Sequence, residues 1–130
     1  MSPRKQIQQP IRVLHIDDDS SFLDLSQTYL ERELRDATVV TADTPQAGLD
    51  KLNRNFDCVV SDYEMPKMDG LELFEMVNER QPRLPFVLYT GKGSEEIASK
   101  ALNAGVTGYF QKGGPDQYQR LANRIEHATN

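Results

Sequence analysis

The sequence predicts an α/β protein with a doubly wound, five-stranded parallel sheet. Short apolar runs alternate with longer stretches of helical periodicity, which is typical of repeated βα units. The first, third and fourth runs are almost continuously apolar, as expected for strands that are buried on both faces. Parallel neighbours require right-handed helical crossovers, and these crossovers cover both faces of the sheet. We expect one domain, because 130 residues of which 38% are apolar suffice for one core.

Five apolar runs are predicted as strands, with an amphipathic helix after each of them. We expect residues 1–9 to form a flexible tail, and residues 10–130 to form the domain. The predicted strands cover residues 11–16, 38–42, 57–61, 85–90 and 106–110.

The predicted helices have one apolar face and recognisable first residues. Thr44 and Pro45 are expected as the cap and first residue of the second helix, and Pro115 as the first residue of the last. The apolar face of the first helix should comprise Phe22, Leu25, Tyr29, Leu30 and Leu34. The apolar face of the last helix should comprise Tyr118, Leu121, Ala122, Ile125 and Ala128.

Composition and charge restrict the partners and the location of the protein. A net charge of -5, with 15 basic and 20 acidic residues, disfavours direct nucleic-acid binding and favours a protein partner or a cation. The single Cys58 cannot form an internal disulfide, and its apolar surroundings predict a buried, inert thiol. No apolar run approaches the roughly 20 residues of a membrane span, and "MSPRKQIQQP" lacks the apolar core of a signal peptide. We therefore expect a cytoplasmic location.

Polar residues follow the predicted strands at their carboxyl ends, where doubly wound sheets carry their sites. The third strand leads into Asp62, which is followed by a Met-Pro pair and a predicted Asp-Gly turn. The other strand ends carry Asp17, Asp18 and Asp19 after the first strand, Thr90 after the fourth and Lys112 after the fifth. These groups could all line one pocket.

Crowded carboxylates repel one another, so they either take up protons or bind a cation. Oxygen ligands without a nearby His or Cys select Mg²⁺ or a related divalent cation such as Mn²⁺. The Thr90 hydroxyl and the Lys112 ammonium suit a phosphoryl group, and an aspartate can accept that group as an acyl phosphate. Taken singly, the acidic run could be a solvated loop in which Ser20 or Ser21 caps a helix. Complementary groups at four separate strand ends instead favour one site that binds both a metal ion and a phosphoryl group.

Four segments together resemble a receiver domain, the phosphoacceptor module of two-component response regulators, over about residues 10–128. They are "VLHIDDD", "SDYEMPKMDG", "YTGKGSEE" and "GYFQK". The resemblance implies a flavodoxin-like (βα)5 fold with strand order 2-1-3-4-5. The segments "YTGKGSEE" and "KGG" are most similar to those of archaeal receivers.

The resemblance also implies roles for the residues at the carboxyl edge. Asp62 corresponds to the phosphorylated aspartate, and Lys112 to the lysine that pairs with the phosphoryl group. The metal, Mg²⁺ or Mn²⁺, would be held by Asp17, Asp18, Asp62 and the main-chain carbonyl of Glu64.

Thr90 and Tyr109 resemble the switch pair of the family. Phosphorylated Asp62 would draw the Thr90 hydroxyl inward and leave space into which Tyr109 could turn. The surface of the fourth helix, fifth strand and fifth helix would then change. A half-buried Tyr109 without a switching role is the alternative. Glu64 and Lys92 occupy positions that tune the rate of phosphoryl hydrolysis in the family, either as a pair or as separate solvated groups.

Two other features bear on the site. Most receivers place a proline across a cis bond after the lysine, whereas Gly113 follows Lys112 here, so this bond could be trans or a strained cis. His15 is expected to be a packed strand histidine rather than a ligand.

The leading functional prediction is a signalling phosphoacceptor, which is not an enzyme with a separate substrate. A histidine kinase or phosphotransfer protein would supply the phosphoryl group. A downstream protein would bind the fourth helix, fifth strand and fifth helix, where the family also forms homodimers. One alternative is a small Mg²⁺-dependent phosphohydrolase with Asp17 as nucleophile, but only Asp116 and Glu126 could supply its late acidic motif. The other is a receiver-like interaction module that is never phosphorylated, which would usually lack a site residue.

Overall fold

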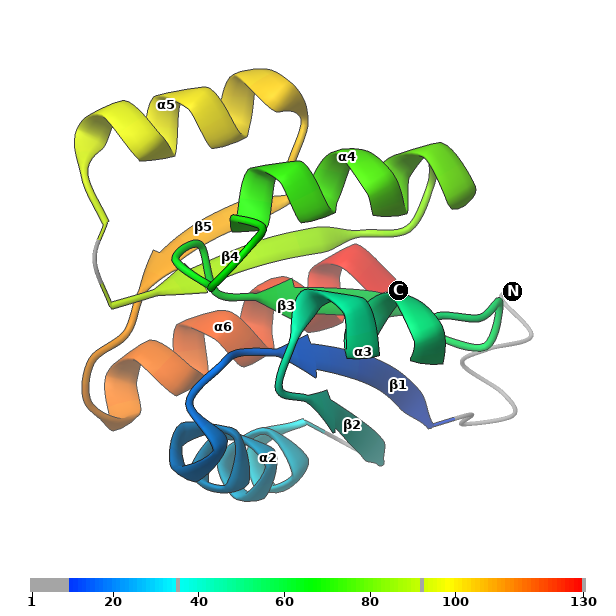
Figure 1. Ribbon diagram of the computed structural model, residues 1–130. Helices are drawn as coiled ribbons and strands as arrows, with labels where there is room; N and C mark the ends of the chain where they lie inside the picture. Colours follow the sequence, from blue (N-terminus) through cyan, green and yellow to red (C-terminus); the bar gives the residue numbers. More distant parts are fainter. Residues whose placement is uncertain (1–9, 35, 92, 130) are drawn as a thin grey trace.

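Five parallel strands form one sheet in the order β2-β1-β3-β4-β5 (Figure 1). Within residues 10–34, 36–91 and 93–129, which the computed structural model describes, five helices alternate with these strands. The strands are β1 (Ile11–Ile16), β2 (Ala37–Ala42), β3 (Cys58–Ser61), β4 (Phe86–Thr90) and β5 (Gly108–Gln111). The helices are α2 (Ser20–Glu33), α3 (Pro45–Lys51), α4 (Gly70–Arg80), α5 (Glu95–Ala104) and α6 (Pro115–Thr129). The predicted fold class and strand order are confirmed. The predicted tail, residues 1–9, lies outside the described residues.

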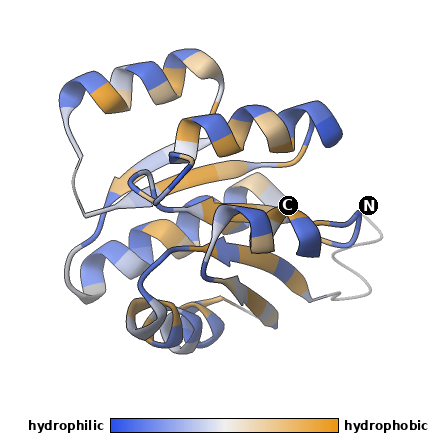
Figure 2. Cartoon of the chain, in the orientation of Figure 1, coloured by the Kyte–Doolittle hydropathy of each residue, from blue (hydrophilic) through white to orange (hydrophobic). Residues whose placement is uncertain are grey.

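Alternation along the strands sends side chains into two separate hydrophobic cores. Leu14 and Ile16 of β1 join the core under α3, α4 and α5, whereas Val13 joins the core under α2 and α6. Val59 and Val60 of β3 divide in the same way. Hydrophobic residues run along β4, whose five residues are all buried (Figure 2). The sheet is therefore covered on both faces, and its carboxyl edge is left for polar groups.

The predicted strand β5 begins later than the apolar pattern indicated. Residues 106 and 107 precede the strand, because the Val106 N–H donates to Ala101 at the end of α5 (3.1 Å). The Thr107 N–H donates to Phe86 (2.7 Å), and the strand then runs from Gly108 to Gln111. The other predicted strands agree with the structure to within one residue at each end.

The predicted apolar face of α2 is wrong at one position, and neither serine considered as an alternative cap is the cap. The carboxylate of Asp19, rather than Ser20 or Ser21, accepts the Phe22 N–H (3.1 Å) and caps the helix. Leu25 is 50% exposed, because the buried stripe of α2 instead passes through Leu23, Ser26 and Leu30.

The other predicted helix features agree with the structure. Thr44 caps α3, and Pro45 is its first residue. Helix α6 begins at Pro115. Its buried residues are Tyr118, Leu121, Ala122 and Ile125, and Ala128 is partly buried.

Cys58 lies in β3 and is buried as predicted, and burial raises the pKa of its thiol to about 12. Among the described residues, no helix combines the length and apolar character needed to cross a lipid bilayer.

Candidate functional site

Backbone hydrogen bonds carry the sheet one residue beyond its strands and so place three polar side chains at its carboxyl edge. Each of these residues donates its N–H to a neighbouring strand, which fixes its backbone relative to that strand. The three bonds run from Asp17 to Ala42 (3.1 Å), from Asp62 to Ile16 (2.9 Å) and from Lys112 to Thr90 (2.9 Å).

Asp17 is fully buried, and both of its carboxylate oxygens have partners. Its Oδ1 accepts the backbone N–H of Asp19 (3.0 Å), and its Oδ2 accepts a hydrogen bond from Lys112 Nζ (2.6 Å). Burial raises the pKa of the Asp17 carboxyl, although the Lys112 ammonium and the Asp19 N–H oppose this shift. The nearby charge of Asp62 raises it further. Keeping Asp17 ionised in this buried position therefore costs free energy, and the Lys112 ammonium partly offsets that cost.

Asp62 lies beside the same lysine. It is 7% exposed, its Oδ1 accepts the N–H of Tyr63 (2.8 Å), and its Oδ2 lies 3.5 Å from Lys112 Nζ. The side chain of Lys112 is 19% exposed, so the ammonium is partly removed from water. One lysine thus bridges two carboxylates, and it lies closer to Asp17 than to Asp62.

The structure brings together the three predicted carboxylate ligands. Asp17, Asp18 and Asp62 each offer an oxygen, and these oxygens lie within 4.8 Å of one another. Asp18 is exposed and opens the cluster to solvent. Three carboxylates without His or Cys among them fit the ligand preference of Mg²⁺ and Mn²⁺, which favour oxygen ligands.

The predicted switch residues lie on β4, which is next to β3, and on β5, which is next to β4. Thr90 is the last residue of β4 and is fully buried. Tyr109 lies in β5 and is half-buried, and its hydroxyl has no hydrogen-bond partner in the part of the chain that the structure describes. That hydroxyl occupies the space that a Cβ on Gly93 would fill. A side chain at position 93 would therefore displace Tyr109.

The remaining predicted site residues are placed less fully. Glu64 follows Asp62 by two residues and is exposed. Lys92 lies outside the described residues, so its predicted pairing with Glu64 stays a prediction. The bond between Lys112 and Gly113 is trans, since no cis peptide occurs among the described residues.

His15 is a packed strand histidine, as the sequence predicted. Its side chain is fully buried, and its Nδ1 lies 3.0 Å from the hydroxyl of Ser26 on α2. Burial, together with the positive charge of Lys112, lowers the pKa of the His15 imidazole to about 3. The ring is therefore neutral at physiological pH.

Sequence reasoning missed three residues that shape this edge. Phe22 lies beside Lys112, with the ammonium 4.1 Å from the centroid of its ring. Asp69 caps α4 with a capping box, and Gly70 is the first residue of that helix rather than part of an Asp-Gly turn. A helix-cap pattern, Asp69 followed three residues later by Glu72, could have identified the start of α4. No sequence signal indicates the ring contact of Phe22.

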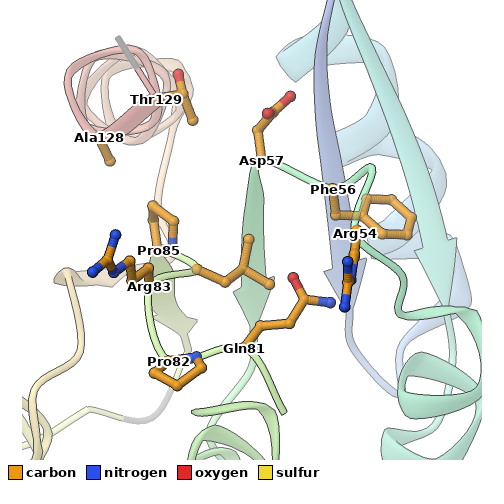
Figure 3. Close-up of a pocket in the computed structure, with 10 residues that line it drawn as sticks. Arg54, Phe56, Asp57, Gln81, Pro82, Arg83, Pro85, Ala128 and Thr129 are labelled. Carbon is orange, nitrogen blue, oxygen red and sulfur yellow. The ribbon is translucent and has the colours of Figure 1, made fainter.

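A hollow lies at the opposite, amino edge of the sheet. It has a volume of about 670 Å³, and Arg54, Asp57 and Arg83 are among the residues that line it (Figure 3). None of the predicted site residues lines this hollow. The carboxyl edge is therefore the candidate site on chemical grounds, because it gathers the complementary charged groups.

The strand order and the acidic cluster define a flavodoxin-like α/β protein whose site suits a divalent cation and a phosphoryl group. The family model for the response regulator receiver domain matches residues 13–126. The chain belongs to the response regulator receiver domain family.

Two curated relatives and one solved structure illustrate the similarity. The transcriptional regulatory protein GlrR of Escherichia coli (strain K12) is 38% identical over 104 residues, which are 79% of this chain and 23% of GlrR. The transcriptional regulatory protein FixJ of Bradyrhizobium diazoefficiens is 35% identical over 114 residues, which are 87% of this chain and 54% of FixJ. A response regulator receiver domain protein from Clostridium thermocellum superposes with a TM-score of 0.83 at 28% identity, covering 92% of this chain and 94% of that protein.

These matches show a receiver domain homologous to two-component response regulators, and they support a phosphoacceptor role in signalling. Receiver domains bind Mg²⁺ through acidic clusters, and their partners are histidine kinases or phosphotransfer proteins. The chain spans about a quarter to a half of the length of the two relatives named above. GlrR and FixJ are bacterial proteins, and a further relative, the two-component response regulator ARR10, is from Arabidopsis thaliana, so these relatives do not support the predicted similarity to archaeal receivers.

Proposed function

We propose that Asp62 accepts a phosphoryl group from the phosphohistidine of a partner kinase or phosphotransfer protein. The observation that carries this proposal is the position of Lys112, whose ammonium lies 3.5 Å from Asp62 Oδ2 and 2.6 Å from Asp17 Oδ2. Asp62 Oδ2 would form the new P–O bond while the P–N bond of the donor breaks and its electron pair leaves with the imidazole. The Lys112 ammonium would then pair with the transferred group.

Asp17, Asp18 and Asp62 would hold a divalent cation, with the main-chain carbonyl of Glu64 as a further ligand. Their mutual spacing, within 4.8 Å, and their oxygen-only chemistry support this assignment. When it is bound, Mg²⁺ or Mn²⁺ supplies positive charge that neutralises the oxygens of the phosphoryl group. Asp18 is exposed and keeps the cluster open to solvent and to a donor.

Thr90 and Tyr109 would form the switch that reads the state of Asp62. Thr90 ends the strand next to Asp62, so its hydroxyl could turn toward a phosphoryl oxygen. Tyr109 has an unpaired hydroxyl within the described structure, and leaving its present position therefore breaks no hydrogen bond that the structure shows. These contacts support a change at the surface formed by α5, β5 and α6.

That surface is also the proposed site of the downstream protein or of a second copy of the chain. The predicted fourth and fifth helices correspond to α5 and α6. Leu102 of α5 is 57% exposed, which gives this surface an apolar group that a partner could cover. The apolar residues of α6 are used inside the fold, so α6 adds no further apolar stripe. Glu64 and Lys92 are proposed to tune the lifetime of the phosphoryl group.

The geometry does not favour Asp17 as the nucleophile of a phosphohydrolase. Its carboxylate is fully buried, and both oxygens are held by Asp19 and Lys112. Asp62 also has a partner on each oxygen, but it is 7% exposed and its Oδ2 lies at the longer distance of 3.5 Å from Lys112 Nζ, so a donor reaches it more easily than Asp17. A module that is never phosphorylated is likewise not favoured, because every group that the reaction requires is present.

The test is intact mass spectrometry after incubation of the chain with Mg²⁺ and a small acyl phosphate. We expect one added phosphoryl group that is labile at alkaline pH, and no addition in Asp62→Asn or with EDTA. Addition that survives in Asp62→Asn would move the nucleophile elsewhere, with Asp17 as the first candidate. No addition to the unmodified chain from either the small donor or a kinase phosphohistidine would refute the phosphoacceptor role.

A further inference from the structure

Three groups that attract a positive charge lie close to the Lys112 ammonium. Asp17 Oδ2 lies 2.6 Å from Nζ, Asp62 Oδ2 lies 3.5 Å from it, and the centroid of the Phe22 ring lies 4.1 Å from it. An ammonium within about 6 Å of a ring centroid is attracted by the electrons of the ring face. Because the lysine side chain is only 19% exposed, water screens this attraction incompletely.

Other aromatic residues hold the Phe22 ring in place. The rings of Tyr118 and Tyr89 lie 6.2 Å and 5.8 Å from it, and His15 meets it edge-on at 6.0 Å. Tyr89, Tyr118 and His15 are all buried. Phe22 therefore rests on a packed aromatic cluster, defined here by these three residues, and has little freedom to turn away from Lys112.

A short chain of hydrogen bonds also ties Phe22 to the acidic cluster. Asp17 Oδ1 accepts the N–H of Asp19, and Asp19 Oδ1 accepts the N–H of Phe22 (3.1 Å). The start of α2 is thereby fixed relative to the carboxylate that Lys112 contacts. These bonds limit how far the backbone of Phe22 can move from the Asp17 carboxylate, and the Lys112 ammonium contacts both residues.

We propose that Phe22 is a positioning residue that holds the Lys112 ammonium beside Asp62. A lysine side chain has several rotatable bonds, and it loses much conformational freedom when its ammonium is fixed. The ring limits the movement of the ammonium on the side that faces α2, so the charge is in place before the phosphoryl group arrives. The effect on transfer rests on the proposed function of Asp62, whereas the contact between the ring and the lysine does not.

The first measurement tests the contact itself in the unphosphorylated chain. The ring current of Phe22 should shift the ε-methylene protons of Lys112 upfield in an NMR spectrum. In Phe22→Leu this shift should disappear, and in Phe22→Tyr it should remain. Tyr29→Leu is the matched control, because Tyr29 stacks on Tyr118 at 4.9 Å within the same aromatic layer but contacts Arg32 rather than Lys112. An unshifted signal in the unmodified chain would overturn the proposal, whatever the fate of the phosphoacceptor role.

The second measurement is the rate of phosphorylation by a small acyl phosphate in saturating Mg²⁺. Phe22→Leu should be slower by about threefold to tenfold, the effect of losing a partly desolvated cation–π contact. Phe22→Tyr should keep most of the rate, and Tyr29→Leu should match the unmodified chain. Thermal unfolding of each variant identifies any general loss of structure.

A double-mutant cycle separates positioning from a merely structural role. In a Lys112→Met background, Phe22→Leu should change the phosphorylation rate by less than about twofold, because the residue it positions is absent. An equal loss in both backgrounds, or no loss in Phe22→Leu alone, would overturn the proposal. If the unmodified chain takes up no phosphoryl group, the proposed function fails, and the NMR measurement alone decides whether Phe22 holds the lysine.

Discussion

Replacing Gly70 with alanine should displace the segment that carries Asp62. Gly70 is the first residue of α4, and its N–H donates to the carbonyl of Tyr63 (2.7 Å). A Cβ at this position would lie 2.5 Å from the carbonyl oxygen of Asp62 and 2.9 Å from Tyr63 Cα. It would also lie 2.7 Å from a methyl group of Leu88. Two of these neighbours are backbone atoms, which cannot rotate away as a side chain can.

The size of the effect follows from these distances. Real Cβ atoms essentially never lie within 3.0 Å of such neighbours, so α4 and the Asp62 segment must separate by about 0.5 Å. Overpacking of this kind costs about 1–3 kcal/mol. Alanine in place of glycine in a helix returns at most about 1 kcal/mol. We therefore expect Gly70→Ala to lower the free energy of unfolding by about 1–2 kcal/mol.

Urea unfolding measures the free energy, and intact mass measures the rate at which Asp62 is phosphorylated. The rate should fall by at least about tenfold, because a misplacement approaching 1 Å can cost about a hundredfold. Gly114→Ala is the matched control, since a Cβ there would meet nothing within 4 Å. It should change the free energy of unfolding by less than about 0.5 kcal/mol. A Gly70→Ala protein as stable and as rapidly phosphorylated as the unmodified chain would refute the steric reasoning.

Three further predictions follow from buried ionisable groups. Burial raises the pKa of Asp17 above its ordinary value of 3.8, so the stability associated with its protonated form is lost as pH rises through the folded-state pKa. Asp17→Asn should therefore raise the free energy of unfolding in urea more at neutral pH than at a pH below 3.8, and an equal gain at both would contradict this. Burial and the charge of Lys112 lower the pKa of His15 to about 3. As pH falls from 6.5 toward 3, His15 is therefore protonated in the unfolded chain but stays neutral in the folded chain. The free energy of unfolding should fall over that range, and nitrogen NMR should show a neutral His15 ring at about pH 5. A His15 ring that titrates near pH 6.5 in the folded protein would disprove the assignment. Burial raises the pKa of Cys58 to about 12, so iodoacetamide should alkylate it only on unfolding, and fast alkylation of the native protein would exclude a buried thiol.

The sheet and the location of the candidate site could be predicted from the sequence because both depend on repeating patterns. Alternating βα units fix a parallel sheet, and a parallel sheet brings the carboxyl ends of its strands to one edge. That topology is sufficient to place Asp17, Asp62 and Lys112 close together, although they are 95 residues apart at most. The chemistry of those side chains then predicts a cation and a phosphoryl group.

Features that depend on one residue of register or on a single side-chain conformation could not be predicted. Leu25 is exposed because the buried stripe of α2 depends on rotation about the helix axis, and each residue turns the helix by about 100°. Asp69-Gly70 has the local preference of a turn, but the close approach of α4 to Asp62 makes the pair a helix start. Phe22 and Lys112 are far apart in sequence, and only the packing of the aromatic cluster brings ring and ammonium together.

The α5 side and the α6 side of the site differ in how firmly they are packed. This difference indicates which side can change conformation when the site changes. Helix α6 buries several large residues beside the aromatic cluster, whereas Ala101 is the buried residue of α5. Moving α5 would therefore expose little apolar surface, while moving α6 would expose much. Tyr109, with its unpaired hydroxyl in the described structure, lies in the strand that α5 leads into. A phosphorylation-dependent switch requires one rigid side, which fixes Lys112, and one loosely packed side, which can rearrange. We therefore expect the conformational change on phosphorylation to appear in α5 before α6.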